Sequence, residues 1–144
     1  MSKIWIKDYS LEVINSIFAS NMTGFLDIKA TAIGDNFLQA TMPVGDKVKQ
    51  PYGILHGGAS VVLAESVGSI ASGLIIDPEK YMGVGMEVNA NHLKSVSSGI
   101  VTATCTPFHI GSKTHVWDIK IHNEEQVLIC ISRLTVAIIA KQKP

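Results

Sequence analysis

The chain has 144 residues, and its 12 Lys and Arg balance its 12 Asp and Glu, so its formal net charge is zero. Charged residues make up only 17% of it, against roughly 25% in an ordinary soluble domain, and its mean hydropathy is +0.28. This length predicts one domain, over residues 1–144. Zero net charge with scattered lysines argues against a nucleic-acid partner, and no apolar run is long enough to predict a membrane span.

The N-terminal sequence and the cysteines predict a cytoplasmic protein. Residues 1–8 show no long apolar stretch before a small-residue cleavage site, so no signal peptide is predicted. Cys105 and Cys130 lie far apart in apolar runs and are expected to be buried, reduced thiols. Since no Cys/His cluster has zinc spacing, we expect no metal site, and no other cofactor is predicted.

The first third of the chain predicts one helix and two strands. Ser10, a good capping residue, precedes apolar residues at positions 11, 14, 17 and 18, which predicts a short amphipathic helix over 10–18. Two strands are expected over 25–33 and 37–44, with a hairpin turn at 34–36. A longer connection containing Gly and Pro follows, over 43–55.

Residues 59–76 form an 18-residue stretch with a single charge, Glu65. Its length and alanine content favour a helix, which Asp77 and Pro78 end. Apolar and small residues occur on every side of this helix, so we expect it to be buried nearly all round.

After Pro78 the pattern changes to the period of two that is typical of strands. Four strands are expected around 84–90, 101–106, 117–121 and 127–139, and the last is apolar enough for a central strand covered on both faces. In the first, Val84, Met86, Val88 and Ala90 alternate with small or polar residues. Because the connections are short, consecutive strands are expected to be antiparallel neighbours.

These elements together predict an α+β fold in which an antiparallel six-stranded curled sheet wraps one long central helix. A helix that is apolar on all sides requires a sheet that curls around it. Such a sheet leaves an edge open, and pairing with a second copy of the chain would close it. The high apolar content fits such an oligomer.

Glu65 is a candidate functional carboxylate. An unpaired charge in an apolar helix is costly, so this group must be paired, neutral or functional. It is either a structural residue bonded to the sheet or a reactive group. Ser69 lies one turn later on the same helix face, where it either holds the carboxylate or a water molecule or is simply a small packing residue.

His56, Gly57 and Gly58 precede the predicted helix. The first amides of a helix have no internal partner and favour negative charge, and two glycines leave them open to an anion or a carbonyl oxygen. The other interpretation is a helix-starting turn that needs a permissive backbone, with His56 as an ordinary turn residue.

The spacing of these two groups bears on assembly. Gly57 and Glu65 are eight residues apart, about 12 Å along a helix. One reacting carbonyl cannot touch both ends of that span. If both groups act on the same atom, they come from different subunits, with two helices packed antiparallel at a dimer interface.

The run from Gln50 to Ser69 resembles the signature of hotdog acyl-CoA thioesterases, in the branch of the phenylacetate-pathway and 4-hydroxybenzoyl-CoA thioesterases. The likeness continues through 89–92, 109–112 and 132–135, and so covers nearly the whole chain. Tyr52 stands where Phe is usual and Lys94 where Arg is common, and both departures leave the chemistry intact.

The resemblance implies hydrolysis of acyl-CoA thioesters to a free acid and CoA. Glu65 would attack the thioester carbonyl or act as a base on water, and the Gly57 amide would stabilise the oxyanion. Gln50 would orient the thioester or the water, His56 would support the carbonyl-binding turn, and Ser69 would position the carboxylate or the water.

The resemblance also implies where CoA and the acyl group bind. Lys94 and Lys113 are candidate partners for the phosphates, although each is otherwise an ordinary solvated lysine. An aromatic acyl group, of 1,4-dihydroxy-2-naphthoyl or benzoyl type, is implied, with a role in menaquinone synthesis and assembly as a homodimer or a homotetramer. The implied substrate-binding residues are Gly85, His92, Leu93, Lys94, Ser95, His109, Ile110, Gly111, Ser112, Lys113 and Thr114.

Two other functions are compatible with the predicted fold. One is dehydration or hydration of hydroxyacyl thioesters, although the spacing of Gln50, Gly57 and Glu65 fits hydrolysis better. The other is a non-catalytic module that binds acyl-CoA, which should lack an intact helix glutamate. The chain has neither the serine-hydrolase motif Gly-x-Ser-x-Gly nor the dinucleotide motif Gly-x-Gly-x-x-Gly.

Overall fold

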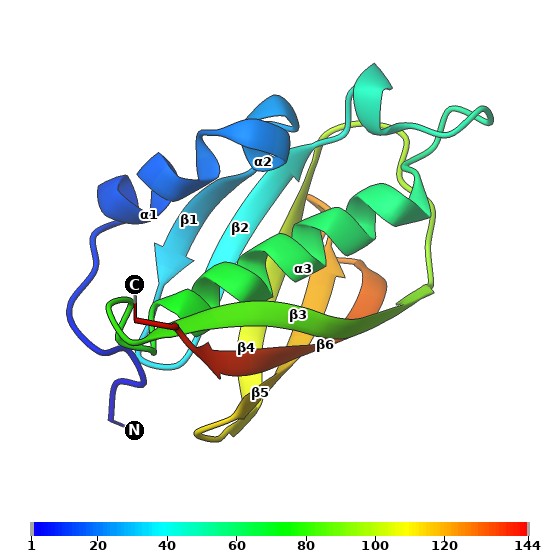
Figure 1. The fold of residues 1–144 in the computed structure, drawn as a ribbon. Coiled ribbons are helices and arrows are strands. Elements are labelled where there is room, and N and C mark those ends of the chain that lie inside the picture. Colours follow the sequence, from blue (N-terminus) through cyan, green and yellow to red (C-terminus); the bar gives the residue numbers. More distant parts are fainter. Residues whose placement is uncertain (1, 144) are drawn as a thin grey trace.

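The computed structural model describes residues 2–143 (Figure 1). Three α-helices, one short 3-10 helix and six strands make up this part of the chain. In chain order they are α1 (Leu11–Phe18), α2 (Asn21–Phe25), β1 (Lys29–Ile33), β2 (Leu38–Pro43), η1 (Asp46–Val48), α3 (Gly57–Gly73), β3 (Tyr81–His92), β4 (Ile100–Ile110), β5 (Thr114–His122) and β6 (Leu128–Ala140).

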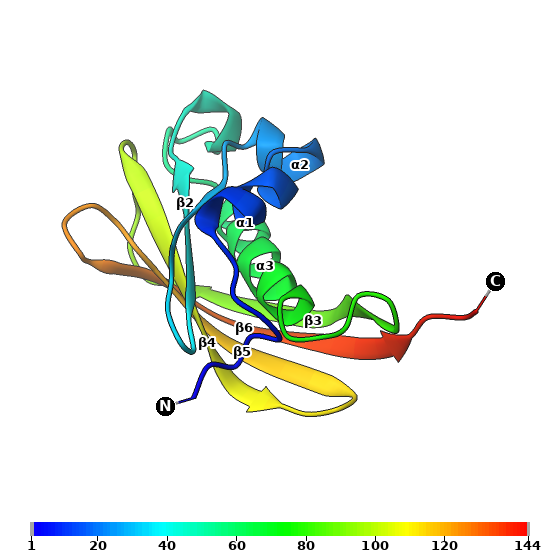
Figure 2. The same ribbon diagram turned by 90° about the vertical axis from the view of Figure 1, so that its left-hand side faces the viewer.

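The six strands form one antiparallel sheet in the order β1-β2-β4-β5-β6-β3. The sheet curls around α3, which lies in its concave face, while α1 packs on β1 at one end of the sheet (Figure 2). The predicted α+β architecture, a six-stranded curled sheet around one long helix, is therefore confirmed.

The core lies between this sheet and α3. On β4 as far as Cys105, and along all of β5, every second side chain is buried, including Val101 and Ala103 on β4 and Trp117 and Ile119 on β5. This is the alternation that the period of two predicts for a sheet with one covered face. Cys105 and Cys130 are both buried and free, as predicted.

Helix α3 begins two residues earlier and ends three residues earlier than predicted. Residues 59–72 are all buried or half-buried, which confirms a helix covered nearly all round. The side that faces the sheet is the more deeply buried, with Leu63 and Val67 inaccessible to solvent. On the other side Val61, Glu65 and Ser69 are only half-buried.

The predicted strand over 25–33 is wrong in its first four residues. Phe25 ends the short helix α2, and the strand begins only at Lys29. Thr23 stabilises the helical turn by donating its hydroxyl to the backbone oxygen of Phe18 at 2.7 Å. Asp27 then adopts a left-handed conformation, with φ 55°, and this reverses the chain before β1.

The strand order corrects the expectation that β3 and β4 are neighbours. β3 pairs with β6 and is an edge strand, whereas β4 lies between β2 and β5. The connection over 93–99 passes near the start of α3, where the amide of Leu55 donates to the backbone oxygen of Val96 at 2.7 Å. The chain thereby leaves the edge of the sheet and returns beside β2.

Two further details of the strands differ from the sequence interpretation. β6 lies inside the sheet, but only one of its faces is covered, since Leu134 and Val136 are buried and Ile131 and Arg133 are exposed. On β3 the register shifts between Gly85 and Glu87, so the four apolar residues expected on one face are divided. Those before and at the shift are exposed, and those after it pack against the core.

A buried polar cluster joins the end of α3 to β5. The indole nitrogen of Trp117 donates to Ser72 Oγ at 2.8 Å, and His115 Nδ1 lies 3.0 Å from the same oxygen. Burial lowers the pKa of His115, the nearby His109 lowers it further, and a backbone hydrogen bond at Gly111 opposes them. The buried imidazole is therefore held neutral.

This cluster predicts loss of stability in acid. Because the folded pKa of His115 lies below its ordinary 6.5, its stabilising contribution is complete above that pH and is lost as pH falls through the folded pKa. His115→Asn should make the thermal unfolding midpoint less dependent on pH between about pH 7.5 and 5. His122→Asn, at the other end of β5 and outside the groups that shift the His115 pKa, is the matched control. Equal slopes for wild type and His115→Asn would contradict the prediction.

Candidate active site

Helix α3 begins with an open amide. His56 is its N-cap, with extended backbone, and its Nδ1 accepts a hydrogen bond from the amide of Gly58 at 2.8 Å. The amide of Gly57 makes no hydrogen bond within residues 2–143. The helix dipole and this free donor together favour an oxygen that carries negative charge.

The end of β3 covers this helix start. A Cβ at position 57 would lie 2.7 Å from Nε2 of His92, closer than real Cβ atoms approach. Any side chain at position 57 would therefore have to displace the imidazole ring of His92. The packing of His92 is thus one reason for glycine at position 57. The other is the expected role of the two motif glycines, which leave the first helix amide open.

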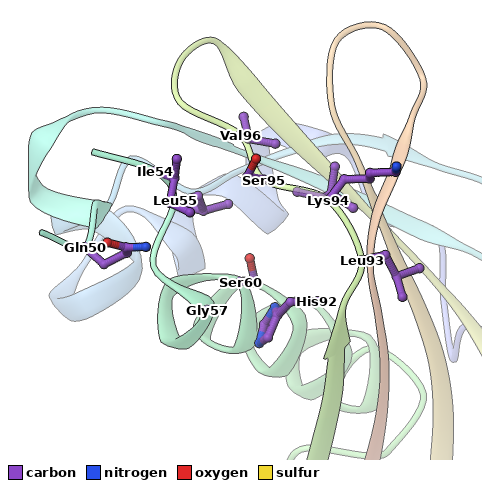
Figure 3. A pocket seen from close by; sticks show the side chains of 11 residues that line it. Gln50, Ile54, Leu55, Gly57, Ser60, His92, Leu93, Lys94, Ser95 and Val96 are labelled. Carbon is purple, nitrogen blue, oxygen red and sulfur yellow. The ribbon is translucent and has the colours of Figure 1, made fainter. Parts of the chain in front are cut away.

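A pocket of about 310 Å³ opens beside the helix start (Figure 3). It brings together six of the residues that the sequence nominated, from three segments of the chain, and adds apolar walls and one buried serine that were not nominated. The nominated residues are Gln50, Gly57, His92, Leu93, Lys94 and Ser95, and the added ones are Ile54, Leu55, Ser60, Val96 and Ile129.

Ser60 is the polar residue that the sequence interpretation missed. Its side chain is only 2% exposed, and its hydroxyl is directed away from α3 and into the pocket (Figure 3). It lies three residues after Gly57, so both residues face the same side of the helix. That spacing from Gly57 could have indicated Ser60 as a site residue. However, nothing in the sequence distinguishes this serine from the other small residues around it.

Gln50 lies at the rim of the pocket and is fixed by its own turn. Its side-chain oxygen accepts from the amide of Tyr52 at 2.5 Å, and its backbone bonds to Gly53 and Ile54. Gly53 has φ +79°, a conformation that favours glycine. Because the oxygen of Gln50 is engaged locally, the amide nitrogen is the group that can donate to a ligand.

Glu65 lies outside this pocket, two turns further along α3, as its spacing from Gly57 requires. Its carboxylate lies against β3, where a Cβ at Gly85 would be 2.5 Å from Glu65 Oε1. It makes no hydrogen bond or ion pair with any residue from 2 to 143. The half-buried Ser69 follows one turn later. A half-buried carboxylate without a partner is ready to bind a group from outside this chain.

The second group of expected CoA-binding residues does not join the first. His109, Lys113 and Thr114 belong to the β4–β5 hairpin, which lies at the other end of the molecule from the start of α3 (Figure 1). Ile110, Gly111 and Ser112 line a separate pocket of about 340 Å³ beside residues 75–77, after the end of α3. Within one chain, therefore, Lys94 and Lys113 do not face a common ligand.

A curled antiparallel sheet wrapped around one long helix is the hotdog fold. The comparisons agree: residues 52–130 match the family model of the thioesterase superfamily, and the chain belongs to this family. Its class of reaction is the hydrolysis of thioesters.

Characterised relatives match almost end to end. The chain is 52% identical to 1,4-dihydroxy-2-naphthoyl-CoA hydrolase of Escherichia coli, over 94% of this chain and 99% of that one. It is 41% identical to a proofreading thioesterase of Cronobacter sakazakii, over 94% and 98%. Among solved structures, a thioesterase variant from Pseudomonas aeruginosa superposes with a TM-score of 0.94 at 45% identity, covering 96% of this chain and all of that one.

Over residues 2–143, no helix is both long and apolar enough to cross a membrane. In the same part of the chain, no three His, Cys, Asp or Glu side chains gather in a way that could hold a metal ion.

The packing of His92 on Gly57 predicts the effect of a methyl group at that position. Gly57→Ala should lower kcat/KM by about 10²- to 10³-fold if the open amide is the oxyanion donor, because the methyl group and the displaced His92 ring crowd that amide. Steady-state thiol release from an acyl-CoA measures this. Gly73→Ala is the control, since nothing lies within 4 Å of a Cβ at the end of the same helix. Similar rates for wild type and Gly57→Ala would show that the Gly57 amide has no role in catalysis.

Proposed function

We propose that the protein hydrolyses aromatic acyl-CoA thioesters, with Glu65 as the catalytic carboxylate and the Gly57 amide as the oxyanion donor. The observation that carries the proposal is Glu65 itself, a half-buried carboxylate that has no partner within residues 2–143. The open helix-start amide beside a pocket supplies the complementary group. The relative that acts on a naphthoyl thioester supports the aromatic class.

The chemistry needs little beyond these two groups, and we propose that it uses no metal or other cofactor. The Gly57 amide polarises the thioester carbonyl, and such a donor is worth about 3 kcal/mol of transition-state stabilisation. Glu65 then takes one of two routes. It removes a proton from water, which attacks the carbonyl and expels CoA as the thiol. Alternatively, it attacks the carbonyl directly and expels CoA, forming a mixed anhydride that water hydrolyses to the free acid.

The remaining nominated residues act around this centre. The side-chain amide of Gln50 donates to the thioester oxygen or to the water, and His56 holds the helix-start turn through its bond to Gly58. Ser69 positions the carboxylate or the water from the next turn of α3. The Lys94 and Lys113 ammonium groups attract the CoA phosphates, since a protein of zero net charge has no general field to do so.

The site is shared between two subunits in this proposal. Gly57 and Glu65 are about 12 Å apart along α3, too far to act on one carbonyl. The free edge of β3 and the half-buried side of α3 are the surfaces that a second copy would cover. Two antiparallel helices would bring Glu65 of one subunit to Gly57 of the other. A homodimer is therefore the smallest active unit, and a homotetramer is its proposed assembly.

Removal of the carboxylate tests the chemistry. Glu65→Ala should lower kcat by about 10²- to 10⁴-fold towards a panel of aromatic and aliphatic acyl-CoAs, measured as thiol release. The aromatic substrates should give the highest kcat/KM with the wild type. Glu87→Ala is the matched control, because Glu87 is exposed on β3 and bonds to Asn89. Equal activity of Glu65→Ala and wild type, or an enoyl product without thiol, would contradict the proposal.

Mixed subunits test the shared site. Glu65→Ala and Gly57→Ala chains should each be nearly inactive alone. When they are unfolded and refolded together in equal amounts, about a quarter of the wild-type sites should be restored, because half of randomly formed dimers are mixed and each has one intact site. Light scattering checks the size of the assemblies. No recovery of activity, or an active monomer, would place both groups of a working site in one chain.

A further inference from the structure

The β-bulge on β3 decides which residues face α3. Gly85 pairs with Val136 and Glu87 with Thr135, so Met86 is an extra residue opposite one partner. Gly85 and His92 are seven residues apart, and in a regular strand an odd separation places residues on opposite faces. The bulge removes this conflict, and the contacts of both residues are with α3, at Glu65 and Gly57.

Only one neighbouring group leaves no room for a side chain at Gly85, and that group is the carboxylate of Glu65. A Cβ there would lie 2.5 Å from Glu65 Oε1. The other nearby atoms, Glu65 Cδ at 3.6 Å and Leu134 Cδ1 at 4.0 Å, are at ordinary van der Waals distances. Gly85 has no left-handed backbone that would require glycine. A methyl group would therefore fit at this position in every respect except for the carboxylate oxygen.

We infer that Gly85 is a positioning residue for Glu65, an inference that rests on the proposed catalytic role of that carboxylate. The bare backbone of β3 lets the carboxylate lie against the strand, and the bulge turns that bare position towards the helix. A side chain at position 85 displaces the carboxylate from β3. A displacement of about 1 Å at a reacting group is enough to cost about 100-fold in rate. Gly85 thus acts on catalysis through Glu65.

Two alanine substitutions on the same face of β3 separate this role from general packing. Gly85→Ala should lower kcat by about 10- to 100-fold and change KM for an acyl-CoA by less than about threefold, with a thermal unfolding midpoint near that of the wild type. Gly83→Ala is the matched control. A Cβ there lies 3.2 Å from Val136 Cγ1 and 3.7 Å from Ser72 Cβ, but has no contact with Glu65.

A double-mutant cycle tests whether the effect passes through the carboxylate. Glu65→Asp withdraws the carboxylate by one methylene group, so adding Gly85→Ala to it should cost less than about threefold in kcat. Equal kcat losses from Gly85→Ala in both backgrounds would overturn the inference. So would losses equal to those of Gly83→Ala, or a raised KM with unchanged kcat, which would indicate a substrate contact.

Further variants separate a failure of the positioning role from a folding defect and from a failure of the proposed function. If Gly85→Ala does not fold, the double variant with Glu65→Asp should fold, since the clash has been removed, and failure of both to fold would overturn the inference. Full activity of Glu65→Ala would overturn the proposed function itself. Loss of activity in Glu65→Ala, with Gly85→Ala as active as the wild type, would overturn only the positioning role.

Discussion

The need to cover α3 determines the rest of this structure. The helix has 17 residues, carries apolar or small side chains on every side, and contains a single charge. A flat sheet covers one side of such a helix, so the sheet curls until five of its strands, β2 to β6, contact it. The side that the curl does not reach is only half-buried. That incompletely covered side carries Glu65, so the unfinished burial and the proposed catalytic carboxylate are at the same place.

The sequence predicted the parts of the fold that depend on local periodicity. The strands and α3 were identifiable because alternation and helical spacing report which side chains face the core. The order of the strands could not be predicted, since it depends on contacts distant in the chain. The turn at Asp27 was missed because it needs a left-handed conformation at a residue other than glycine. The bulge at Met86 was hidden for another reason. One inserted residue leaves regular alternation on both sides of it, and only the pairing with β6 shows the change of face.

The candidate site, like the fold, could be predicted from the sequence only where local rules determine it. Gln50, Gly57 and Glu65 lie within sixteen residues of each other, so their arrangement on one turn and one helix follows from local rules. Ser60 required knowledge of which helix side lines the pocket. The distance between Lys94 and the hairpin at 109–114 follows from the length of strand β4, because the two segments lie at its opposite ends. Sequence likeness places residues in a site but does not say which subunit supplies them.

Strand β3 links the two chemical groups of the proposed site. Where α3 has no side chain, at Gly57, the strand supplies the ring of His92, and where α3 presents the Glu65 carboxylate, the strand has no side chain, at Gly85. The bulge lets one strand satisfy both contacts. β3 is also one of the two edge strands of the sheet, and it is the edge where the proposed second copy would add its strand. Pairing along this edge would hold the strand against α3 and fix the amide and the carboxylate together, so in the proposed dimer the same strand completes the site and sets its geometry.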